Sequence, residues 1–379
     1  MNADSNIAEF LVAGLGRLRP ARPQPPDAPQ SVFVLRNNDI GDLLVVTPLF
    51  EALRWRYPSA RLVAGVGSWS FDVLQNNPHL DAVVPVSAPW HNKYSRPRDG
   101  SRLRHAVASL RYLCFSQEVR ELRRMRFDIG IDVLGSRWGA LLFLRAGIPF
   151  RLGVRGYAGG HSAMSQCVAY HSAEHVGRAA LRFAEMLGLK ELPENRPQIF
   201  LTEGEKENGA ELWRRSMAES AHPRKRVILA PGAGLPEKRW PIENYQAVVR
   251  RLAARGDVFM AVVGGPSDRA DARRLAEVAP QACRNMAGEL SLRAAFALAA
   301  SADLVVCSSS SMMHAAAAFR IPTVVVLGPF YSSARSHAAQ WGHGGSCVIL
   351  GPERNAGVGL PSPDEILAPI ARFLGPVQK

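Results

Sequence analysis

The sequence predicts an α/β protein built from two Rossmann-like domains, each with a parallel sheet covered by helices. Short, apolar, β-branched segments alternate with amphipathic segments of helical length along the chain. This alternation begins at Ser31 and begins again at Val227, after a polar, proline-containing break at 193–197. At 379 residues the chain is long for one hydrophobic core, so two domains are expected.

The composition is that of a soluble globular protein, with 47% hydrophobic and 21% charged residues. No apolar run approaches the ~20 residues that span a bilayer. Asp4 and Glu9 precede only a short apolar patch, which makes the N-terminus a poor secretory signal. Five scattered cysteines show neither a CxxC pair nor metal-ligand spacing. We expect reduced thiols, no metal site and a cytoplasmic protein.

Residues 1–30 are interpreted as an N-terminal tail with a proline-rich spacer at 20–29. One short amphipathic turn is conceivable there, followed by three arginines; its apolar residues would be Ile7, Phe10, Leu11 and Leu15. A disordered extension is the interpretation that we favour.

The first domain is expected at 31–200, with a basic insertion at 90–126. Its strands are expected at 32–35, 61–66, 82–86, 128–134 and 151–154. Its helices are expected near 42–56, 68–76, 102–125, 136–146 and 176–188.

The second domain is expected at 201–355, beginning with a charged helix at 202–220. Its strands are expected at 227–230, 258–263, 303–307 and 323–327. Its helices are expected near 242–255, 268–279, 291–300 and 312–319. Residues 356–379 form a C-terminal segment with a final helix near 364–374.

The first strand leads into a polar turn that carries the best candidate for a catalytic group. Asn37, Asn38 and Asp39 break the apolar run, Gly41 allows a tight turn, and a helix starts near Asp42. Ligands bind at the carboxyl ends of strands in open α/β sheets. Asp42 is therefore a candidate general base, and the alternative is that it only caps the helix.

A glycine-containing loop, 231–234, follows the first strand of the second domain directly. Glycine permits close approach of the backbone to a ligand, but the loop lacks the endings of a P-loop or a dinucleotide fingerprint. The alternative is an ordinary strand-exit turn. Lys238 could neutralise a departing diphosphate, or it could be a solvated surface lysine. Trp240 is interpreted as a packing residue rather than a base-stacking one.

Four serines, 308–311, lie between a predicted strand and a predicted helix. Their hydroxyls and the free N–H groups of the helix N-terminus make a good anion site. The alternative is a simple serine N-cap, which accounts for one of the four. His314, one turn into the helix, is either a structural hydrogen-bonding residue or a ligand contact.

The insertion carries much of the excess positive charge. Between Lys93 and Arg126 there are ten basic and three acidic residues, a net charge of +7 out of +13 for the chain. Aromatic and apolar residues are interleaved with the arginines, among them Trp90, Tyr94, Leu103, Val107, Leu110, Tyr112, Leu113, Phe115 and Val119. A basic amphipathic helix suits the surface of an anionic membrane. The alternative is a solvated helix, and no nucleic-acid recognition motif is present.

Several of these segments, taken in order, resemble glycosyltransferase family 9, the ADP-heptose:lipopolysaccharide heptosyltransferases. Asp39-Ile40-Gly41-Asp42 with Thr47-Pro48 is similar to the N-terminal signature of this family. The other matching segments are 128–135, Ala230-Pro-Gly-Ala with Lys238-Arg-Trp-Pro, Asn285-Met-Ala-Gly288 with Leu292, and Ser309 to His314 with Ala316, Pro322 and Gly328-Pro329. The resemblance covers roughly residues 31–330.

The resemblance implies a GT-B arrangement, with two parallel sheets facing a central cleft and the C-terminal helix packed back on the first domain. It implies an inverting glycosyltransferase that moves heptose from ADP-heptose onto a lipopolysaccharide core or related glycolipid, with no cofactor beyond the donor. Asp42 would be the general base and Asp39 the alternative base. The partners would be a nucleotide sugar and an anionic glycolipid, with peripheral contact at the inner face of the inner membrane and no nucleic acid.

The resemblance also implies the site residues. Donor contacts would come from Pro231, Gly232, Ala233, Lys238, Gly264, Ala287, Gly288, Ser309, Ser310, Ser311 and His314. Acceptor contacts would come from Asp39, Gly41, Arg120, Arg123 and Arg124. No metal ligands are expected.

Two departures from the family pattern bear on the donor sugar. Ser309-Ser310-Ser311 stands where the family has Asp-Ser-Gly, and Phe330-Tyr-Ser-Ser replaces a threonine-led turn. The missing acid would hold hydroxyls of the donor sugar. A non-catalytic protein that binds a sugar nucleotide or glycolipid is therefore the alternative function, and a nucleotide-sugar epimerase is a third.

Overall fold

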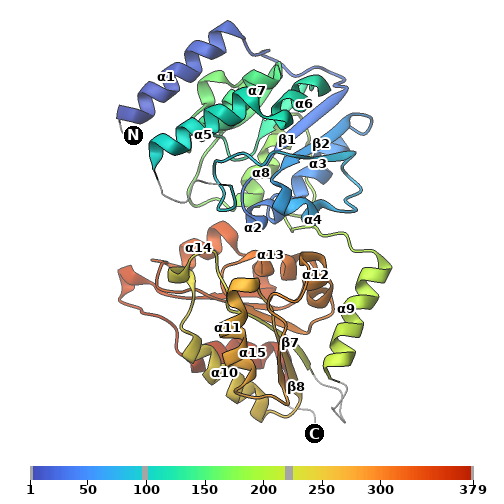
Figure 1. Ribbon diagram of the computed structural model, residues 1–379, viewed down its shortest axis with the longest axis vertical. Coiled ribbons are helices and arrows are strands. Elements are labelled where there is room, and N and C mark those ends of the chain that lie inside the picture. The colour runs from blue at the N-terminus through green and yellow to red at the C-terminus, as the bar shows by residue number, and fades with distance from the viewer. Residues whose placement is uncertain (1–2, 96–100, 218–224, 377–379) are drawn as a thin grey trace. The chain divides into compact units, whose positions relative to one another are not determined.

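The computed structural model describes residues 3–95, 101–217 and 225–376 (Figure 1). The chain divides into two compact units, 1–195 and 196–379, whereas the sequence analysis places the boundary after residue 200. Each unit is an α/β domain with a sheet of six parallel strands. The structure therefore confirms the predicted fold class for both halves of the chain.

The first sheet has the strand order β3-β2-β1-β4-β5-β6. Val32 of β1 lies opposite Leu62 of β2 and Ile129 of β4, so β1 is a central strand. The bounds are β1 Ser31–Leu35, β2 Arg61–Val66, β3 Ala82–Pro85, β4 Ile129–Asp132, β5 Phe150–Arg155 and β6 Gln166–Ala169. All five residues of β1 are buried, because helices cover both faces of a parallel sheet.

Eight helices of the first domain lie in the described residues: α1 Ala3–Leu18, α2 Ile40–Leu44, α3 Pro48–Arg56, α4 Phe71–Leu74, α5 Arg102–Phe115, α6 Gln117–Met125, α7 Arg137–Ala146 and α8 Val176–Met186. On one face, Phe33 of β1 packs with Phe127 and with Phe143 of α7. On the other, α3 packs against α8 and β2.

Two predicted helices are each split in the structure. The segment expected as one helix at 42–56 forms α2 and α3, since Pro48 has no N–H to donate to a continuous helix. The segment expected at 102–125 forms α5 and α6. Ser116 has extended backbone and accepts a hydrogen bond from the Val119 amide, which ends one helix and caps the next.

The expected disordered N-terminal extension is wrong for residues 3–18, which form α1. Val12 is buried and packs with Ala140 and Leu144 of α7. The Glu9 carboxylate accepts hydrogen bonds from the amides of Gly160 and Ser162. Apolar contact and these two bonds together hold the helix against the domain.

The second sheet has the order β12-β11-β10-β7-β8-β9, which is the same topology as the first. Its strands are β7 Lys225–Ala230, β8 Val258–Val262, β9 Cys283–Asn285, β10 Leu304–Cys307, β11 Thr323–Val326 and β12 Cys347–Leu350. Its helices are α9 Glu203–Ser216, α10 Ile242–Ala254, α11 Arg269–Ala276, α12 Leu292–Ala300, α13 Ser311–Ala318, α14 Ala334–Trp341 and α15 Pro363–Leu374.

The C-terminal helix, which the resemblance places on the first domain, is part of the core of the second domain. Ile366, Ile370 and Leu374 of α15 belong to the core of the second domain, where α15 lies against α10, β10 and β11. The indole N–H of Trp240 donates to the Pro361 carbonyl at 3.0 Å and ties the start of α15 to this core. Trp240 is 2% exposed, so it is a packing residue as predicted.

The sequence analysis missed β6, β9, β12 and α14. Two residues of the short strand β9 are Arg284 and Asn285, which break the apolar pattern of a buried strand. The strand β12 is half-buried at an edge of its sheet, and the small residues of α14 give no clear helical period.

The shared topology sets where ligands can bind. In each sheet the chain leaves the two central strands toward opposite edges, so the loops after them diverge and leave a crevice at the carboxyl ends. These strands are β1 and β4 in the first domain, and β7 and β10 in the second. The candidate residues Asp42, Pro231 and Ser309 all lie on the loops or helices that follow them.

Helix α9 is attached to the second domain through a glycine and a tryptophan. Trp213 is 1% exposed and its indole N–H donates to the carbonyl of Leu298 on α12. Gly209, one helical turn earlier, lies so close to α12 that a Cβ would overlap the Ala297 carbonyl. Gly204 on the same helix has nothing within 4 Å of a Cβ position.

Gly209→Ala is therefore expected to destabilise the protein by about 1–3 kcal/mol, because the backbone of α12 has to move. Gly204→Ala is the matched control and should raise stability by up to about 1 kcal/mol through helix propensity alone. Thermal unfolding of both variants measures the difference. Equal melting temperatures for the two variants would mean that α9 is not packed on α12.

Candidate active site

The candidate base lies at the carboxyl end of β1. Arg36, Asn37 and Asn38 leave the strand as buried residues, and Asp39 is the N-cap of α2. Asp42 lies in the first turn of this helix, so it is not the N-cap residue. Gly41 lies within α2 rather than in the turn, which is made by the residues before it.

A buried arginine positions Asp42. The Arg36 Nε donates a hydrogen bond to the backbone carbonyl of Asp42 at 3.2 Å, and a terminal nitrogen lies 3.9 Å from its Oδ1. The Arg36 side chain is 5% exposed, whereas that of Asp42 is 31% exposed. The Arg36 guanidinium therefore holds the start of α2, while the Asp42 carboxylate stays accessible to a substrate.

A second carboxylate lies at the end of the neighbouring strand β4. Asp132 is 1% exposed and accepts hydrogen bonds from the amides of Gly135 and Ser136 at 3.1 and 2.9 Å. Burial raises the pKa of Asp132 to about 6, against the opposing effects of these amides and of Arg36. Asp132 holds the start of α7, and Gly139 leaves room for its carboxylate.

The loop after β3 is tied to the same edge of the sheet. The Asn38 side chain donates to the carbonyl of His91, and the Lys93 amide donates to Asp39. The rings of Trp69 and Tyr94 stack with centroids 4.8 Å apart. Burial and the charge of Asp39 raise the pKa of Tyr94 to about 12. Asp39 is thus engaged in holding this loop.

The three arginines predicted to contact the acceptor lie on α6 and are exposed. Arg123 and Arg124 are in its last turn, close to Arg126, whose carbonyl accepts a hydrogen bond from Ser31 at the start of β1. Asp42 follows the opposite end of that strand. The structure therefore does not bring Arg123 and Arg124 to Asp42.

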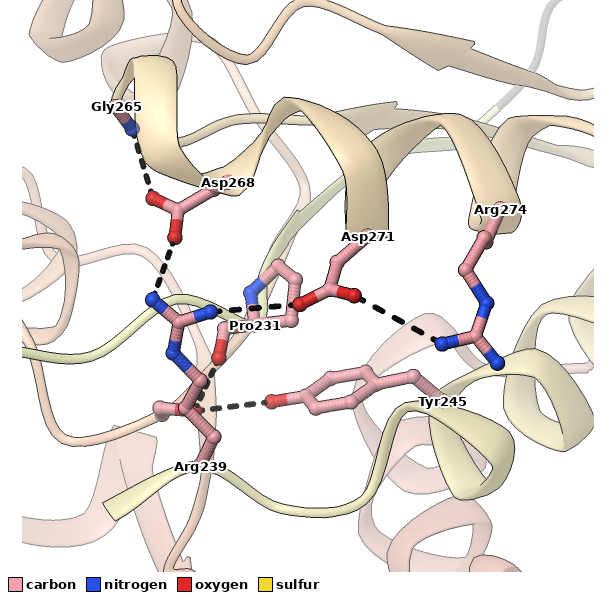
Figure 2. Close-up of polar contacts among 8 residues, drawn as sticks. Pro231, Arg239, Tyr245, Gly265, Asp268, Asp271 and Arg274 are labelled. Atoms are coloured by element: carbon pink, nitrogen blue, oxygen red, sulfur yellow. Dashed lines mark hydrogen bonds and ion pairs between the residues drawn. The ribbon is translucent and has the colours of Figure 1, made fainter. Parts of the chain in front are cut away.

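In the second domain, the loops after β7 and β10 are joined to each other. The Ser308 hydroxyl donates to the Pro231 carbonyl at 2.9 Å, and the Tyr245 hydroxyl lies 3.5 Å from the Ser308 oxygen (Figure 2). Ser308 is fully buried, so its hydroxyl is part of the framework. Gly232 and Ala233 directly follow Pro231 in the chain, and Ser309 directly follows Ser308. These predicted donor residues are therefore next to the hydrogen-bonded pair.

An acidic residue that the sequence analysis did not select organises the glycine loop. Asp268 accepts a hydrogen bond from the Gly265 amide at 2.9 Å and pairs with Arg239 at 3.0 Å (Figure 2). A Cβ at Gly232 or Gly264 would lie 2.6 or 2.7 Å from this carboxylate. These glycines are therefore required by packing against Asp268, independently of any ligand.

Gly288 and Ala287 complete this part of the loop structure. The Gly288 amide donates to the Gly264 carbonyl at 2.8 Å, and its φ of +71° favours glycine. Ala287 is buried in the core. The structure brings these predicted donor residues together at one edge of the sheet. The Arg239 guanidinium also pairs with Asp271 at 3.4 Å.

Lys238 lies among aromatic side chains instead of acidic ones. Its Nζ is 5.0 Å from the ring centroid of Phe330 and 5.9 Å from that of Tyr331. It forms no ion pair with any residue that the structure describes. Burial and the charge of Lys238 lower the pKa of His337 to about 4, so this imidazole is neutral at pH 7.

The two departures from the family pattern are in contact. The Tyr331 and Ser309 side chains lie within interaction distance, and Ser309 opposes the rise of the Tyr331 pKa that burial causes. Tyr331 also packs against His337, with ring centroids 4.8 Å apart. The serine and the altered turn at 330–333 therefore form one local arrangement around Lys238.

The start of α13 leaves hydroxyls available. Ser310 is its N-cap residue but makes no side-chain capping bond, so the simple N-cap interpretation does not apply to it. Ser311 is the first residue of the helix. His314 is 4% exposed, and its Nδ1 lies 2.8 Å from the Nε2 of His343. This pairing supports a structural role for His314.

The residues that sequence reasoning missed are Arg36, Asp132, Arg239, Asp268, Tyr331 and His337. Asp132, Arg239 and Tyr331 lie within segments that the sequence analysis recognised, so the signal available was the charged or aromatic side chain inside each segment. Among the described residues, no group of three or more His, Cys, Asp or Glu side chains is placed to hold a metal ion.

The sequence profile of glycosyltransferase family 9 (heptosyltransferase) matches residues 117–348. Lipopolysaccharide heptosyltransferase 2 of Escherichia coli is 26% identical over 314 residues, covering 79% of this chain and 82% of that protein.

Two solved structures are similar over most of the chain. A family 9 glycosyltransferase from Veillonella parvula has a TM-score of 0.72 at 17% identity, covering 91% of this chain and 97% of that one. The ADP-heptose lipopolysaccharide heptosyltransferase II of E. coli has a TM-score of 0.67 at 22% identity, covering 91% and 98%. The fold is therefore that of the GT-B glycosyltransferases.

In the described parts of the chain, no helix has the length and apolar character needed to cross a membrane. The profile match extends over more than half of the sequence and includes both candidate donor loops and α13. The chain belongs to glycosyltransferase family 9 and is a glycosyltransferase.

Proposed function

We propose that this enzyme transfers heptose from ADP-heptose, with inversion, onto a lipopolysaccharide core or a related glycolipid. The observation that carries the proposal is the setting of Asp42. Its accessible carboxylate lies in the first turn of α2, at the carboxyl end of a central strand, and the buried Arg36 fixes the helix beneath it. The names of the relatives in E. coli support the donor and acceptor classes.

In the proposed reaction, Asp42 accepts the proton of an acceptor hydroxyl as its oxygen attacks the anomeric carbon of the donor. The new glycosidic bond forms on the face opposite the nucleotide, and the bond between the anomeric carbon and the phosphate oxygen breaks. ADP leaves with the electron pair of that bond.

The second domain supplies the charge that stabilises ADP as it leaves. Lys238 has no acidic partner among the described residues, so its positive charge is available to a diphosphate. Ser310 and Ser311 add hydroxyls and helix amides at the same edge of the sheet. Donor contacts by Pro231, Gly232, Ala233, Gly264, Ala287, Gly288 and His314 remain part of the proposal.

Asp42→Asn should lower kcat by about 10²–10⁴-fold, because an amide cannot accept the proton. Donor affinity should hardly change. The variant keeps the backbone carbonyl that Arg36 binds, so the fold of α2 is preserved. Asp39→Asn is the control and should have a smaller effect on kcat. Near wild-type turnover by Asp42→Asn would make Asp39 the next candidate.

Lys238→Ala should weaken ADP binding and slow turnover, because the departing diphosphate loses a neutralising cation. Lys190→Ala, an exposed lysine of the first domain, is the control and should behave as wild type. Isothermal titration with ADP and steady-state kinetics measure both effects. Activity should persist in excess EDTA; complete loss that magnesium restores would contradict a metal-independent leaving-group role for Lys238.

Ser309→Asp should raise activity with ADP-heptose if heptose is the natural donor, since charge-assisted hydrogen bonds to sugar hydroxyls are roughly twice as strong as neutral ones. Tyr331→Phe, alone and combined with Ser309→Asp, forms a double-mutant cycle that measures the coupling of the two residues. Lower activity with ADP-heptose, and higher activity with another nucleotide sugar, would reject heptose as the donor. No turnover by either protein, with nucleotide binding intact, would favour the non-catalytic alternative.

A further inference from the structure

Helix α5 presents apolar side chains to solvent on a face separate from its buried one. Its buried residues are Ser109 and Leu113, which pack toward α6 and α7. Leu103, Val107, Leu110 and Phe115 are 75%, 56%, 51% and 71% exposed. The first three recur at the i, i+4, i+7 spacing of one helix face, so they form a continuous apolar stripe.

Arginines without acidic partners border this stripe. Arg111 lies beside it on α5, and Arg120, Arg123 and Arg124 form the exposed side of α6. None of these four forms an ion pair with a described residue. The two nearby acids are engaged elsewhere: Glu118 accepts hydrogen bonds from Tyr112 and from the Ser87 amide, and Glu121 bonds Gln117.

The apolar stripe and the arginines that form no ion pair with a described residue occur together on α5 and α6. On a solvated helix, four large exposed apolar side chains are unfavourable, because their apolar surface is in contact with water. A soluble anion would engage the arginines but not the apolar stripe. The interface of an anionic bilayer accommodates both, because leucine and phenylalanine enter the acyl boundary while arginines contact lipid phosphates.

We propose that α5 and α6 form a docking surface for an anionic lipid bilayer, in which Leu103, Val107, Leu110 and Phe115 insert and the arginines bind headgroups. Arg120, Arg123 and Arg124 would then hold the enzyme at the membrane rather than contact the reacting acceptor hydroxyl. The surface is connected to the candidate active site, because His105 of α5 contacts Trp138, and Trp138 stacks on Trp90 beside Asn37.

Helix α1 carries further exposed apolar side chains in the same domain. It packs on α7, as α5 and α6 do, and Figure 1 shows α1, α5 and α7 together in the first domain. Its side chains Phe10, Leu15 and Leu18 are 71%, 48% and 79% exposed. Two helices that both pack on α7, namely α1 and α5, therefore carry exposed apolar side chains in the first domain.

The first test is flotation of the full-length protein with vesicles of phosphatidylglycerol and phosphatidylcholine, compared with pure phosphatidylcholine. Arg120→Glu, Arg123→Glu and Arg124→Glu together should lower the partition coefficient on anionic vesicles by about 100-fold or more. Added salt should weaken wild-type binding. The matched control reverses the charge at Arg250, Arg273 and Arg372 by replacing each with glutamate. These are three exposed arginines of the second domain that form no ion pair with described residues.

Wild-type binding by the α6 variant, or an equal loss in the control, would overturn the proposal. Binding that inorganic phosphate or an acidic protein competes away fully at low salt would assign the arginines to a soluble anion or a protein instead. All six side chains are exposed, so the variants should fold, and thermal unfolding checks this. Nucleotide binding should be unchanged, so the outcome does not depend on the proposed donor or acceptor.

The second test measures insertion of the apolar stripe. Cys114 lies on the stripe and is the one of the five free cysteines that is exposed, so it can carry an environment-sensitive fluorophore. Its emission should shift to the blue on anionic vesicles, and Leu103→Ser with Val107→Ser and Leu110→Ser should abolish the shift. The control places the label at Arg250→Cys in a Cys114→Ser background. No shift at Cys114 for the bound wild type would contradict insertion.

Discussion

The constraint on which the rest of this structure depends is the divergence of the chain at the centre of each parallel sheet. In both domains the two central strands send their following loops toward opposite edges, so the crevice at their carboxyl ends is never filled by a crossover. The candidate site residues lie on the loops and helices that follow these strands. Asp42 comes directly after one such strand, and the serines that end at Ser311 come after another. The strands themselves are apolar and buried, and contribute only position.

Guanidinium groups hold these loops in place. Arg36 binds the backbone of Asp42 in the first domain, and Arg239 binds Asp268 in the second. Burial of Arg36 is costly, and its hydrogen bond to the Asp42 carbonyl offsets part of that cost. Arg239 is partly exposed; its terminal nitrogens pair with Asp268 and Asp271, whereas its Nε has no hydrogen-bond partner among the described residues. The same reasoning explains why glycine is required at 232 and 264: the Asp268 carboxylate occupies the space where a side chain would begin.

The sequence was sufficient to predict the fold class, the start of the strand–helix alternation in each domain, and the loops that follow β1, β7 and β10. These features depend on the local apolar pattern and on turn chemistry. It was not sufficient where tertiary contact overrides local pattern. Helix α1 looked disordered because its order comes from Val12 packed on α7 and from the amides that bind Glu9. The place of α15 in the core of the second domain depends on α10, β10 and β11, which are distant in sequence. The pairing of Asp268 with Arg239 has no sequence signature at all.

The contact between Ser309 and Tyr331 changes the meaning of the missing acid. In the sequence, the loss of a carboxylate at 309 and the altered turn at 330–333 are two separate departures; in the structure Ser309 and Tyr331 interact beside Lys238. A carboxylate at 309 would add negative charge next to Lys238, the cation that we propose for the diphosphate. The phenol supplies a hydrogen-bonding group without that charge, and its ring packs against the cation. Ser309 and Tyr331 therefore leave the charge of Lys238 available to the diphosphate of the proposed donor, which argues against loss of the donor site.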